Sequence, residues 1–355
     1  MKAWVLHGIG DIRFETVDNP VPGEGEVLVQ VKAAGICGSD IPRLYQNGAY
    51  SHPLIPGHEF AGIVAETGTG VDKGLLGQRV GVFPLIPCGT CLPCRRGHFE
   101  MCRNYSYTGS RRDGAFAEYV TVPVRNLICL PQEVSFEEAA MLEPMSVAVH
   151  AMRRVHPQKE EKIVICGLGT IGLLLLSFLL EAGAGRILVV GNKDFQRQMV
   201  QRSGLSEHAF YDSRQGNAAE WILEQTEGNG ADVFFECAGK NETCTLAVES
   251  AAPLGRVLLV GNPFTDMILP KDIYWKILRN QLTVSGSWNS SFLQKPEDDW
   301  HYALHRLTGK QIAPSKLITH RIPLAHLDQG LHIMKNKTED NGKIMVYNGQ
   351  ERSLR

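Results

Sequence analysis

Residues 162–184, KIVICGLGTIGLLLLSFLLEAGA, constrain the fold more than any other segment. Residues 163–166 have the pattern of a buried parallel strand, and residues 173–182 continue as an apolar helix. The glycines between them follow G-x-G-x-x-G spacing, which permits a sharp turn, a close approach to a pyrophosphate and tight packing of helix on strand. The segment therefore predicts a dinucleotide-binding turn. Its residues are Gly167, Gly169, Thr170, Ile171 and Gly172.

The same segment is apolar enough to raise the alternative of a membrane span. Three glycines, Thr170 and Ser177 interrupt it, and Lys162 and Glu181 lie at its edges. These polar and flexible positions favour a strand followed by a helix. We expect no membrane association.

The composition excludes several other classes of function. The 355 residues are enough for two domains. Lys and Arg number 36 against 38 Asp and Glu, a net charge of -2, which does not favour nucleic acid as the main partner. The N-terminus lacks an apolar core of signal-peptide length. Nine cysteines without such a signal indicate a reducing compartment and metal ligation, so we expect a cytoplasmic protein.

The order of predicted elements indicates two domains of different class. Residues 1 to about 80 are β-rich, with extended runs at 26–33 and 60–65 and many Gly and Pro residues between them. From residue 146 onward, predicted strands and helices alternate, which is typical of a doubly wound parallel sheet. The strands are 186–190, 232–235, 256–260 and 281–285, and the helices are 194–202, 220–226 and 241–251.

A polar helix at 296–308 and a strand at 343–347 indicate a return of the chain to the first domain. We therefore expect an α/β protein. Its β-rich catalytic domain would comprise residues 1–147 and 290–355, and its Rossmann domain residues 148–289. The strand at 281–285 would lie at the edge of the sheet and could pair with a second subunit.

Two short motifs in the β-rich part carry candidate ligands for a catalytic zinc. They are GICGSD at 35–40, with Cys37, and GHE at 57–59, with His58. A thiolate and an imidazole suit zinc, but a third protein ligand is needed. Glu59 and Glu143 are both candidates. Taken singly, Cys37 could be a small buried residue and His58 a hydrogen-bonded turn histidine.

Four further cysteines form the least ambiguous motif, Cys88-x2-Cys91-x2-Cys94-x7-Cys102. Four thiolates this close in a Pro- and Gly-rich loop can close a tetrahedral structural zinc site. Disulfides are the alternative, but C-x-x-C spacing strains an intramolecular bridge. We expect the remaining cysteines to be inert core residues; they are Cys129, Cys166, Cys237 and Cys244.

The segment 109–119, GSRRDGAFAEY, is a basic turn that enters a strand. Arg111 and Arg112 could be solvated charges. They could equally form an anion-binding pair that faces a substrate phosphate.

Taken together, these motifs resemble the zinc-containing medium-chain alcohol and polyol dehydrogenases over essentially the whole chain. GSRRDGAFAEY and the segment LRNQLTVSGSWNSS at 278 are most similar to the branch of galactitol-1-phosphate 5-dehydrogenases and sorbitol dehydrogenases. The resemblance implies a GroES-like catalytic domain beside the Rossmann domain, with one catalytic and one structural zinc. It also implies hydride transfer between a secondary alcohol and NAD or NADP, and a homodimer or homotetramer.

The resemblance also assigns residues to the catalytic site. Cys37 and His58 would hold the catalytic zinc, with Glu143 or Glu59 as the third protein ligand. Ser39 would be the proton-relay hydroxyl. Pro42 stands near the place where some members carry a relay histidine, which leaves the onward path of the proton open.

The residues around Gly191 bear on the choice of coenzyme. Members that prefer NAD usually carry an Asp near this position to bind the ribose hydroxyls. Here the strand ends in Gly191-Asn192-Lys193, and Arg197 follows, so a 2′-phosphate would meet cations. Asp194 could still supply a carboxylate. We expect NADP to be tolerated.

Two alternative functions remain open at this point. One keeps the zinc and hydride chemistry but acts on a bulkier apolar alcohol such as a hydroxysteroid, with Tyr45, Trp288 and Phe292 lining the pocket. The other is a noncatalytic dinucleotide-binding protein on the same fold.

Overall fold

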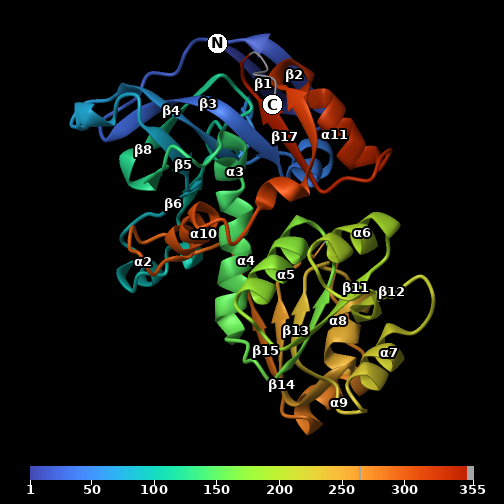
Figure 1. The fold of residues 1–355 in the computed structure, drawn as a ribbon. Coiled ribbons are helices and arrows are strands. Elements are labelled where there is room, and N and C mark those ends of the chain that lie inside the picture. The colour runs from blue at the N-terminus through green and yellow to red at the C-terminus, as the bar shows by residue number, and fades with distance from the viewer. Residues whose placement is uncertain (264, 350–355) are drawn as a thin grey trace. The chain divides into compact units, whose positions relative to one another are not determined.

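The computed structural model describes residues 1–263 and 265–349 and divides the chain into two compact units (Figure 1). The first unit comprises Met1–Pro144 and the chain from Ser291 onward, and the second comprises Met145–Ser290. The boundary at residue 144 lies within helix α4 (Leu142–Val155). None of the described helices is both long and apolar enough to cross a bilayer.

The first unit is built on a seven-stranded sheet in the order β16-β17-β3-β4-β5-β9, with β8 also paired to β3. Two further pairs, β1 with β2 and β6 with β7, are antiparallel. The strands are β1 (Lys2–Gly8), β2 (Asp11–Thr16), β3 (Glu26–Ile36), β4 (Glu59–Thr67), β5 (Arg79–Val82), β6 (Leu85–Ile86), β7 (Ser106–Tyr107), β8 (Tyr119–Pro123), β9 (Leu127–Cys129), β16 (Ile318–Pro323) and β17 (Lys343–Tyr347).

The helices of this unit are short and lie between the strands in sequence. They are α1 (Asp40–Pro42), α2 (Leu92–Arg95), α3 (Phe136–Ala140), α10 (Asp299–Thr308) and α11 (Leu327–Asn336). The predicted helix at 296–308 thus begins at Asp299, because the side chain of Asp298 caps it by accepting a hydrogen bond from the His301 amide at 2.8 Å. Helix α11 was not predicted.

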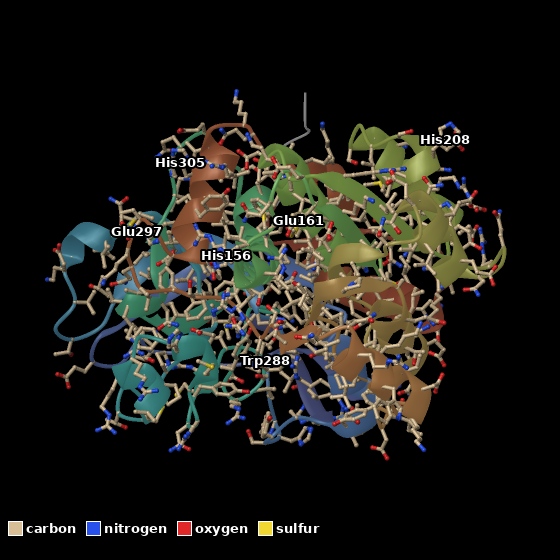
Figure 2. All side chains as sticks on the ribbon, turned by 90° about the horizontal axis from the view of Figure 1, so that it is seen from below. His156, Glu161, His208, Trp288, Glu297 and His305 are labelled. Atoms are coloured by element: carbon tan, nitrogen blue, oxygen red, sulfur yellow. The ribbon has the colours of Figure 1, made fainter. Side chains whose placement is uncertain are left out.

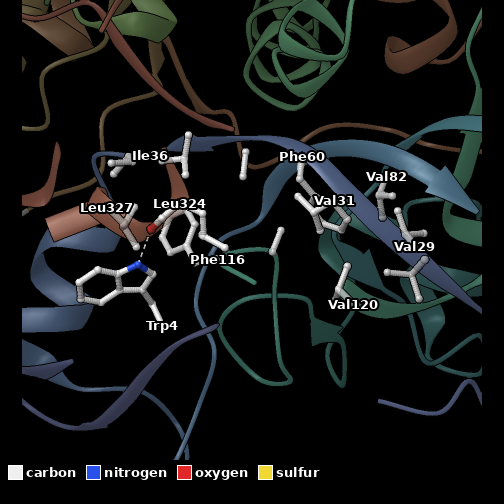
Figure 3. Close-up of a cluster of buried hydrophobic side chains, with 14 of the residues drawn as sticks. Trp4, Val29, Val31, Ile36, Phe60, Val82, Phe116, Val120, Leu324 and Leu327 are labelled. Carbon is white, nitrogen blue, oxygen red and sulfur yellow. Dashed lines mark hydrogen bonds between the residues drawn. The ribbon is translucent and has the colours of Figure 1, made fainter. Parts of the chain in front are cut away.

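The C-terminal return is fixed by the sheet and by the core of the first unit. Strand β17 pairs antiparallel with β3, so residues 344–347 lie opposite residues 33–36. The core joins apolar side chains from both ends of the chain, such as Trp4, Phe60 and Leu327 (Figure 3). Within it, the Trp4 indole donates a hydrogen bond to the Leu324 carbonyl at 2.6 Å.

The second unit is a six-stranded parallel sheet in the order β12-β11-β10-β13-β14-β15 (Figure 1). This is the strand order of a Rossmann fold, with the first strand at the centre, and it confirms the predicted doubly wound sheet. The strands are β10 (Lys162–Cys166), β11 (Arg186–Gly191), β12 (Phe210–Asp212), β13 (Ala231–Glu236), β14 (Ala251–Leu259) and β15 (Thr283–Gly286). The helices are α5 (Thr170–Glu181), α6 (Asp194–Arg202), α7 (Ala218–Gln225), α8 (Asn241–Glu249) and α9 (Lys271–Arg279).

Several elements of this unit differ from the prediction. Strand β12 was not predicted, and β14 begins at Ala251, where the predicted helix 241–251 was still expected to continue, instead of at residue 256. Helix α5 begins three residues earlier than expected, directly after the glycine turn, with Gly169 as its N-cap. Helix α9 was not predicted.

Candidate active site

The first candidate site lies where strand β3 ends and strand β4 begins. The two strands are antiparallel with Gly35 opposite Glu59, so Cys37, just past the end of β3, comes close to His58. The ligand atoms of Cys37, His58 and Glu59 all lie within 4.8 Å of one another. A thiolate, an imidazole and a carboxylate at this separation form a donor set that fits zinc.

Asp40 lies behind His58 and is fully buried. Its Oδ1 is 3.5 Å from the Nδ1 of His58 and accepts a hydrogen bond from Arg43 at 2.8 Å, and its Oδ2 accepts one from the Cys37 amide at 3.0 Å. The Nδ1 of His58 is buried and has no hydrogen-bond partner among the described residues, so the contact with Asp40 is electrostatic and places the carboxylate on the Nδ1 side of the ring.

The charges around His58 also change its acidity. Burial alone would lower the pKa of His58, but the Asp40 carboxylate and the Cys37 thiolate together raise that pKa well above its ordinary value. Without a metal, the imidazole therefore carries a proton that zinc would have to displace.

Glu143, the other candidate for third ligand, comes from the first turn of α4 and is buried. Its Oε1 accepts a hydrogen bond from the Tyr107 hydroxyl at 3.2 Å, and the ring of Tyr107 lies 5.7 Å from that of His58. Burial raises the pKa of Glu143 to about 7, and the charge of Glu59 adds to this effect while His58 opposes it. Glu143 lies outside the described set of ligand atoms that fall within 4.8 Å.

Glu59 also interacts with a residue outside the donor set. Both of its carboxylate oxygens accept hydrogen bonds from Lys343 of strand β17. Ser39 is also next to the donor set, because its hydroxyl donates a hydrogen bond to the Cys37 sulfur at 3.3 Å. Pro42 ends helix α1 and carries no side-chain proton donor.

The second candidate site is the four-cysteine loop around α2. The sulfur atoms of Cys88, Cys91, Cys94 and Cys102 all lie within 4.8 Å of one another. Three of the sulfur–sulfur distances are 3.4, 3.9 and 4.0 Å. They are close to the separation of about 3.8 Å that follows from four Zn–S bonds of about 2.3 Å in a tetrahedron. All nine cysteines of the chain are free thiols.

The acidities within this loop differ between the thiols. Hydrogen bonds from the Thr90 and Cys91 amides lower the pKa of Cys88 to about 5, so this residue is a thiolate at neutral pH. Burial raises the pKa of Cys94 to about 12 in the absence of a metal. A bound zinc would have to displace the proton of the Cys94 thiol, as zinc does in cysteine sites generally.

The sequence predicts that the remaining four cysteines are core residues, but this holds only for one of them. Cys166 is buried at the end of β10, but Cys129 is exposed on β9, and Cys237 and Cys244 are only partly buried.

The glycine turn of the second unit borders a cavity of about 710 Å³. Gly167 has φ of +97°, and a Cβ there would lie 2.7 Å from the Ala238 amide, so the turn requires glycine. The lining includes Gly167, Gly169, Gly191 and Asn192, at the carboxyl ends of β10 and β11. This is where a Rossmann fold holds a dinucleotide. The first turn of α5 holds Thr170, Ile171 and Gly172, with Gly172 packed against the Gly167 carbonyl.

The two basic residues expected at the coenzyme phosphate are placed differently. Lys193 is the N-cap of α6, whereas Arg197 covers the Phe210 ring at 4.8 Å and lies 3.5 Å from Glu207. Neither is among the residues that line the cavity.

The carboxylates of Asp194, at the start of α6, and Asp212, at the end of β12, both form ion pairs. Arg214 contacts both Asp212 and Asp194 at 2.6 Å. The cavity corner beside β11 is instead formed by neutral side chains, which belong to Asn192, Gln196 and Ser213.

Comparison with known proteins identifies the family. The model of the alcohol dehydrogenase GroES-like domain matches residues 23–132, and that of the zinc-binding dehydrogenases matches residues 170–309. The galactitol 1-phosphate 5-dehydrogenase of Escherichia coli K12 is 34% identical over 322 residues, which cover 90% of this chain and 92% of that protein. The chain belongs to the zinc-binding alcohol dehydrogenase family.

Two further matches extend over nearly the whole of this zinc-binding dehydrogenase. The sorbitol dehydrogenase of Bacillus subtilis is 35% identical over 353 residues, which cover 98% of this chain and 97% of that one. A solved structure from Sinorhizobium meliloti 1021, described as a zinc-binding dehydrogenase bound to NADP, has a TM-score of 0.89 at 30% identity, covering 98% of this chain and 99% of that one. The matches confirm the expected fold class, and they confirm an oxidoreductase that uses zinc and NAD or NADP.

Several residues of this zinc-binding dehydrogenase that contact the candidate sites were missed in the sequence. Asp40 stands inside GICGSD and could have been found from its spacing to Cys37. Tyr107, Gln196 and Lys343 follow no local pattern, because each reaches its site only through the tertiary fold. Gln196 accepts a hydrogen bond from the Asn192 amide and donates one to the Leu168 carbonyl, so it joins the two loops of the coenzyme cavity.

Proposed function

We propose that the protein oxidises a secondary alcohol, namely a sugar alcohol or a sugar-alcohol phosphate, and transfers its hydride to NAD or NADP. The observation that carries the proposal is the donor set of Cys37, His58 and Glu59, with Asp40 buried behind the imidazole. The intact donor set argues against the alternative of a noncatalytic dinucleotide-binding protein.

Different residues of the first unit would have different roles in catalysis. When bound, zinc supplies a Lewis acid that lowers the pKa of an alcohol hydroxyl, and the coenzyme supplies the hydride acceptor. Cys37 and His58 would hold the metal, and Asp40 would orient the imidazole from its Nδ1 side. Ser39, whose hydroxyl lies 3.3 Å from the Cys37 sulfur, would receive the hydroxyl proton of the substrate.

The third protein ligand in this proposal is Glu59 or Glu143. Proximity supports Glu59, which completes the set within 4.8 Å. Its bonds to Lys343 compete with that role, whereas Glu143 keeps one oxygen that Tyr107 does not engage. We propose that the two carboxylates exchange at the metal.

The choice of substrate class rests on the relatives and on the aromatic residues. The names of the two similar enzymes state that they act on galactitol 1-phosphate and on sorbitol. Of the residues that could have lined a steroid pocket, Phe292 packs in the core against Phe83 and Trp300, and Tyr45 lies under Lys335 at 4.0 Å. The side chain of Trp288, which is labelled in Figure 2, has an exposed fraction of 54%. These placements disfavour the apolar alcohol.

For the coenzyme we propose the glycine turn and the cavity beside it as the binding site. The residues are Gly167, Gly169, Thr170, Ile171, Gly172, Gly191 and Asn192, with Lys193 near the adenosine ribose. Arg214 forms ion pairs with Asp194 and Asp212, so neither carboxylate would repel a 2′-phosphate. We therefore propose that the protein accepts NADP as well as NAD.

We also propose that the protein is a homodimer or homotetramer. Strand β15 ends the six-stranded sheet and pairs only with β14 among the described strands, and Val284 on it is 39% exposed. Helix α9, which precedes it, exposes Tyr274, Trp275 and Leu278. An exposed strand edge with apolar neighbours supports pairing with a second copy. Light scattering tests this, and a monomer would contradict it.

A cytoplasmic location fits the same scheme. Thiolate ligands have to stay reduced to bind zinc, and the chain offers five of them in the two candidate metal sites.

The function is tested by a rate comparison on purified, zinc-loaded protein. NAD and NADP are each combined with galactitol 1-phosphate, sorbitol and an apolar secondary alcohol. Turnover of either polyol supports the proposal, and turnover of the apolar alcohol alone refutes the substrate class. Cys37→Ala should lose one of two zinc ions and nearly all activity, while Cys129→Ala, at an exposed thiol, is the matched control.

A further inference from the structure

Arg111 and Arg112 are neighbours in sequence, but the structure gives them different surroundings. Arg112 lies 2.9 Å from the Glu26 carboxylate and donates hydrogen bonds to the carbonyl and hydroxyl of Thr121. These partners belong to strands β3 and β8, which pair with each other. Arg112 therefore has a structural role, and its charge is already neutralised.

The guanidinium of Arg111, in contrast, packs against two aromatic rings. Its central carbon lies 4.2 Å from the ring centroid of Tyr50 and 4.2 Å from that of Tyr105. One nitrogen donates a hydrogen bond to the Tyr105 carbonyl at 3.2 Å. Within the described part of the chain, no carboxylate lies within ion-pair distance of Arg111, and its Nε is buried without a hydrogen-bond partner.

A guanidinium in this setting is a preorganised binding site for an anion. Contacts with two aromatic rings restrict the orientation of the guanidinium, so less side-chain entropy is lost when a ligand binds. The N–H groups of the two terminal nitrogens that do not bind the Tyr105 carbonyl can donate hydrogen bonds to a phosphate, whereas Nε is buried. Tyr50 is 72% exposed, which keeps this cluster in contact with solvent.

A series of ring contacts connects Arg111 with the candidate zinc ligands. Tyr105 and Tyr107 pack edge to face with centroids 6.2 Å apart, and Tyr107 contacts the His58 ring at 5.7 Å. The Arg111 amide donates a hydrogen bond to the Tyr107 carbonyl at 2.9 Å. Two ring contacts therefore separate the clamped guanidinium from a zinc ligand, and all of these residues belong to the first unit.

We propose that Arg111, clamped by Tyr50 and Tyr105, binds the phosphate of a phosphorylated polyol whose carbinol reacts at the zinc site. The inference rests on the proposed function and narrows its substrate class to a sugar-alcohol phosphate. It also assigns the two arginines separate roles, since Arg112 takes no part in binding the phosphate.

The test compares galactitol 1-phosphate with galactitol, which differ only in the phosphate. The measured quantity is the ratio of kcat/KM for the two substrates, determined on zinc-loaded enzyme in a phosphate-free buffer. Arg111→Gln should lower this ratio by about 10- to 150-fold, because charged hydrogen bonds to the phosphate are lost. Arg111→Lys, which keeps the charge but not the planar fork, should fall in between. Arg112→Gln is the matched control and should leave the ratio unchanged.

The first part of a second measurement needs only the wild-type enzyme. Inorganic phosphate should inhibit the wild-type enzyme competitively against galactitol 1-phosphate, and calorimetry should detect phosphate binding to wild type but not to Arg111→Gln. An unchanged ratio in an active Arg111→Gln enzyme would overturn the proposal, and so would wild-type turnover of galactitol without phosphate binding. In the latter case the polyol function stands. Phosphate binding through Arg111 without any polyol turnover would instead overturn the proposed function.

Discussion

The ammonium of Lys343 lies 2.8 Å from Oε1 and 2.5 Å from Oε2 of Glu59, and both side chains are almost fully buried. Burial would lower the pKa of Lys343, but the charges of Glu59 and Cys37 raise it, so the lysine stays protonated. Lys343 also donates a hydrogen bond to the Ile36 carbonyl. The last described strand of the chain thus neutralises a carboxylate of the candidate zinc site.

Replacing Lys343 with Met should therefore destabilise the protein strongly. The change leaves Glu59 as a buried carboxylate without its cation, a loss that typically costs about 3–5 kcal/mol. Urea unfolding measures the difference, with Lys316→Met at an exposed lysine as the control. The double variant Glu59→Gln and Lys343→Met should recover much of the loss. Equal stability of Lys343→Met and wild type would show that the buried pair contributes nothing.

The features that the sequence revealed are those encoded over short distances. The four cysteines fall within fifteen residues, and the glycine turn joins one strand to the next helix, so spacing alone indicates both. GICGSD and GHE are farther apart, and their proximity follows from the antiparallel pairing of β3 with β4.

What the sequence could not show depends on long-range packing. Lys343 reaches Glu59 from 284 positions away because β17 pairs with β3. The third zinc ligand stayed open for the same reason, since Glu143 and Glu59 come from different elements. The roles of Arg111 and Arg112 were equally unresolved, because only the fold places Glu26 beside one and two tyrosines around the other.

Zinc uptake by the metal-free enzyme should depend on pH through His58. The raised pKa of His58 means that zinc must displace a proton, so zinc affinity should fall as pH drops below that pKa. Asp40→Asn removes the carboxylate that raises this pKa and should release fewer protons at pH 7. It should also weaken zinc binding about 10- to 100-fold, because the imidazole is no longer oriented.

Calorimetry in two buffers of different ionisation enthalpy counts the protons released in that experiment. Asp11→Asn, which removes an exposed carboxylate paired with Arg13, is the control. Equal proton release by wild type and Asp40→Asn would contradict the proposed link between these two residues.

Coenzyme preference should respond to Lys193 more than to Arg197. Lys193 has no ion pair among the described residues, whereas Arg197 lies against Glu207 and Phe210. We expect Lys193→Ala to raise KM for NADP by about three- to tenfold with little change for NAD. Arg197→Ala should change either value by less than about twofold. A strong preference for NAD that neither substitution alters would refute a cationic pocket for the 2′-phosphate.

The stability of the zinc-free enzyme should fall as pH rises from about 4.5 to about 7, because Glu143 resists ionisation in its buried position. Its folded-state pKa of about 7 exceeds the ordinary value of 4.5, so the folded protein binds the proton more tightly than the unfolded chain. The stabilisation is complete below pH 4.5 and is lost as pH rises through the folded pKa. Each pKa unit corresponds to about 1.4 kcal/mol, so the loss is on the order of 3 kcal/mol.

Glu143→Gln should flatten this pH dependence, and Tyr107→Phe should move it to higher pH. The amide cannot ionise, whereas Tyr107→Phe removes a hydrogen bond that favours the ionised carboxylate. Urea unfolding of chelator-treated protein between pH 4.5 and 8 measures both effects, with Glu133→Gln at an exposed carboxylate as control. The same pH slope in Glu143→Gln and wild type would assign the dependence to other groups. A flat profile in Glu143→Gln alone would identify Glu143 as the carboxyl group that the zinc-free site keeps protonated.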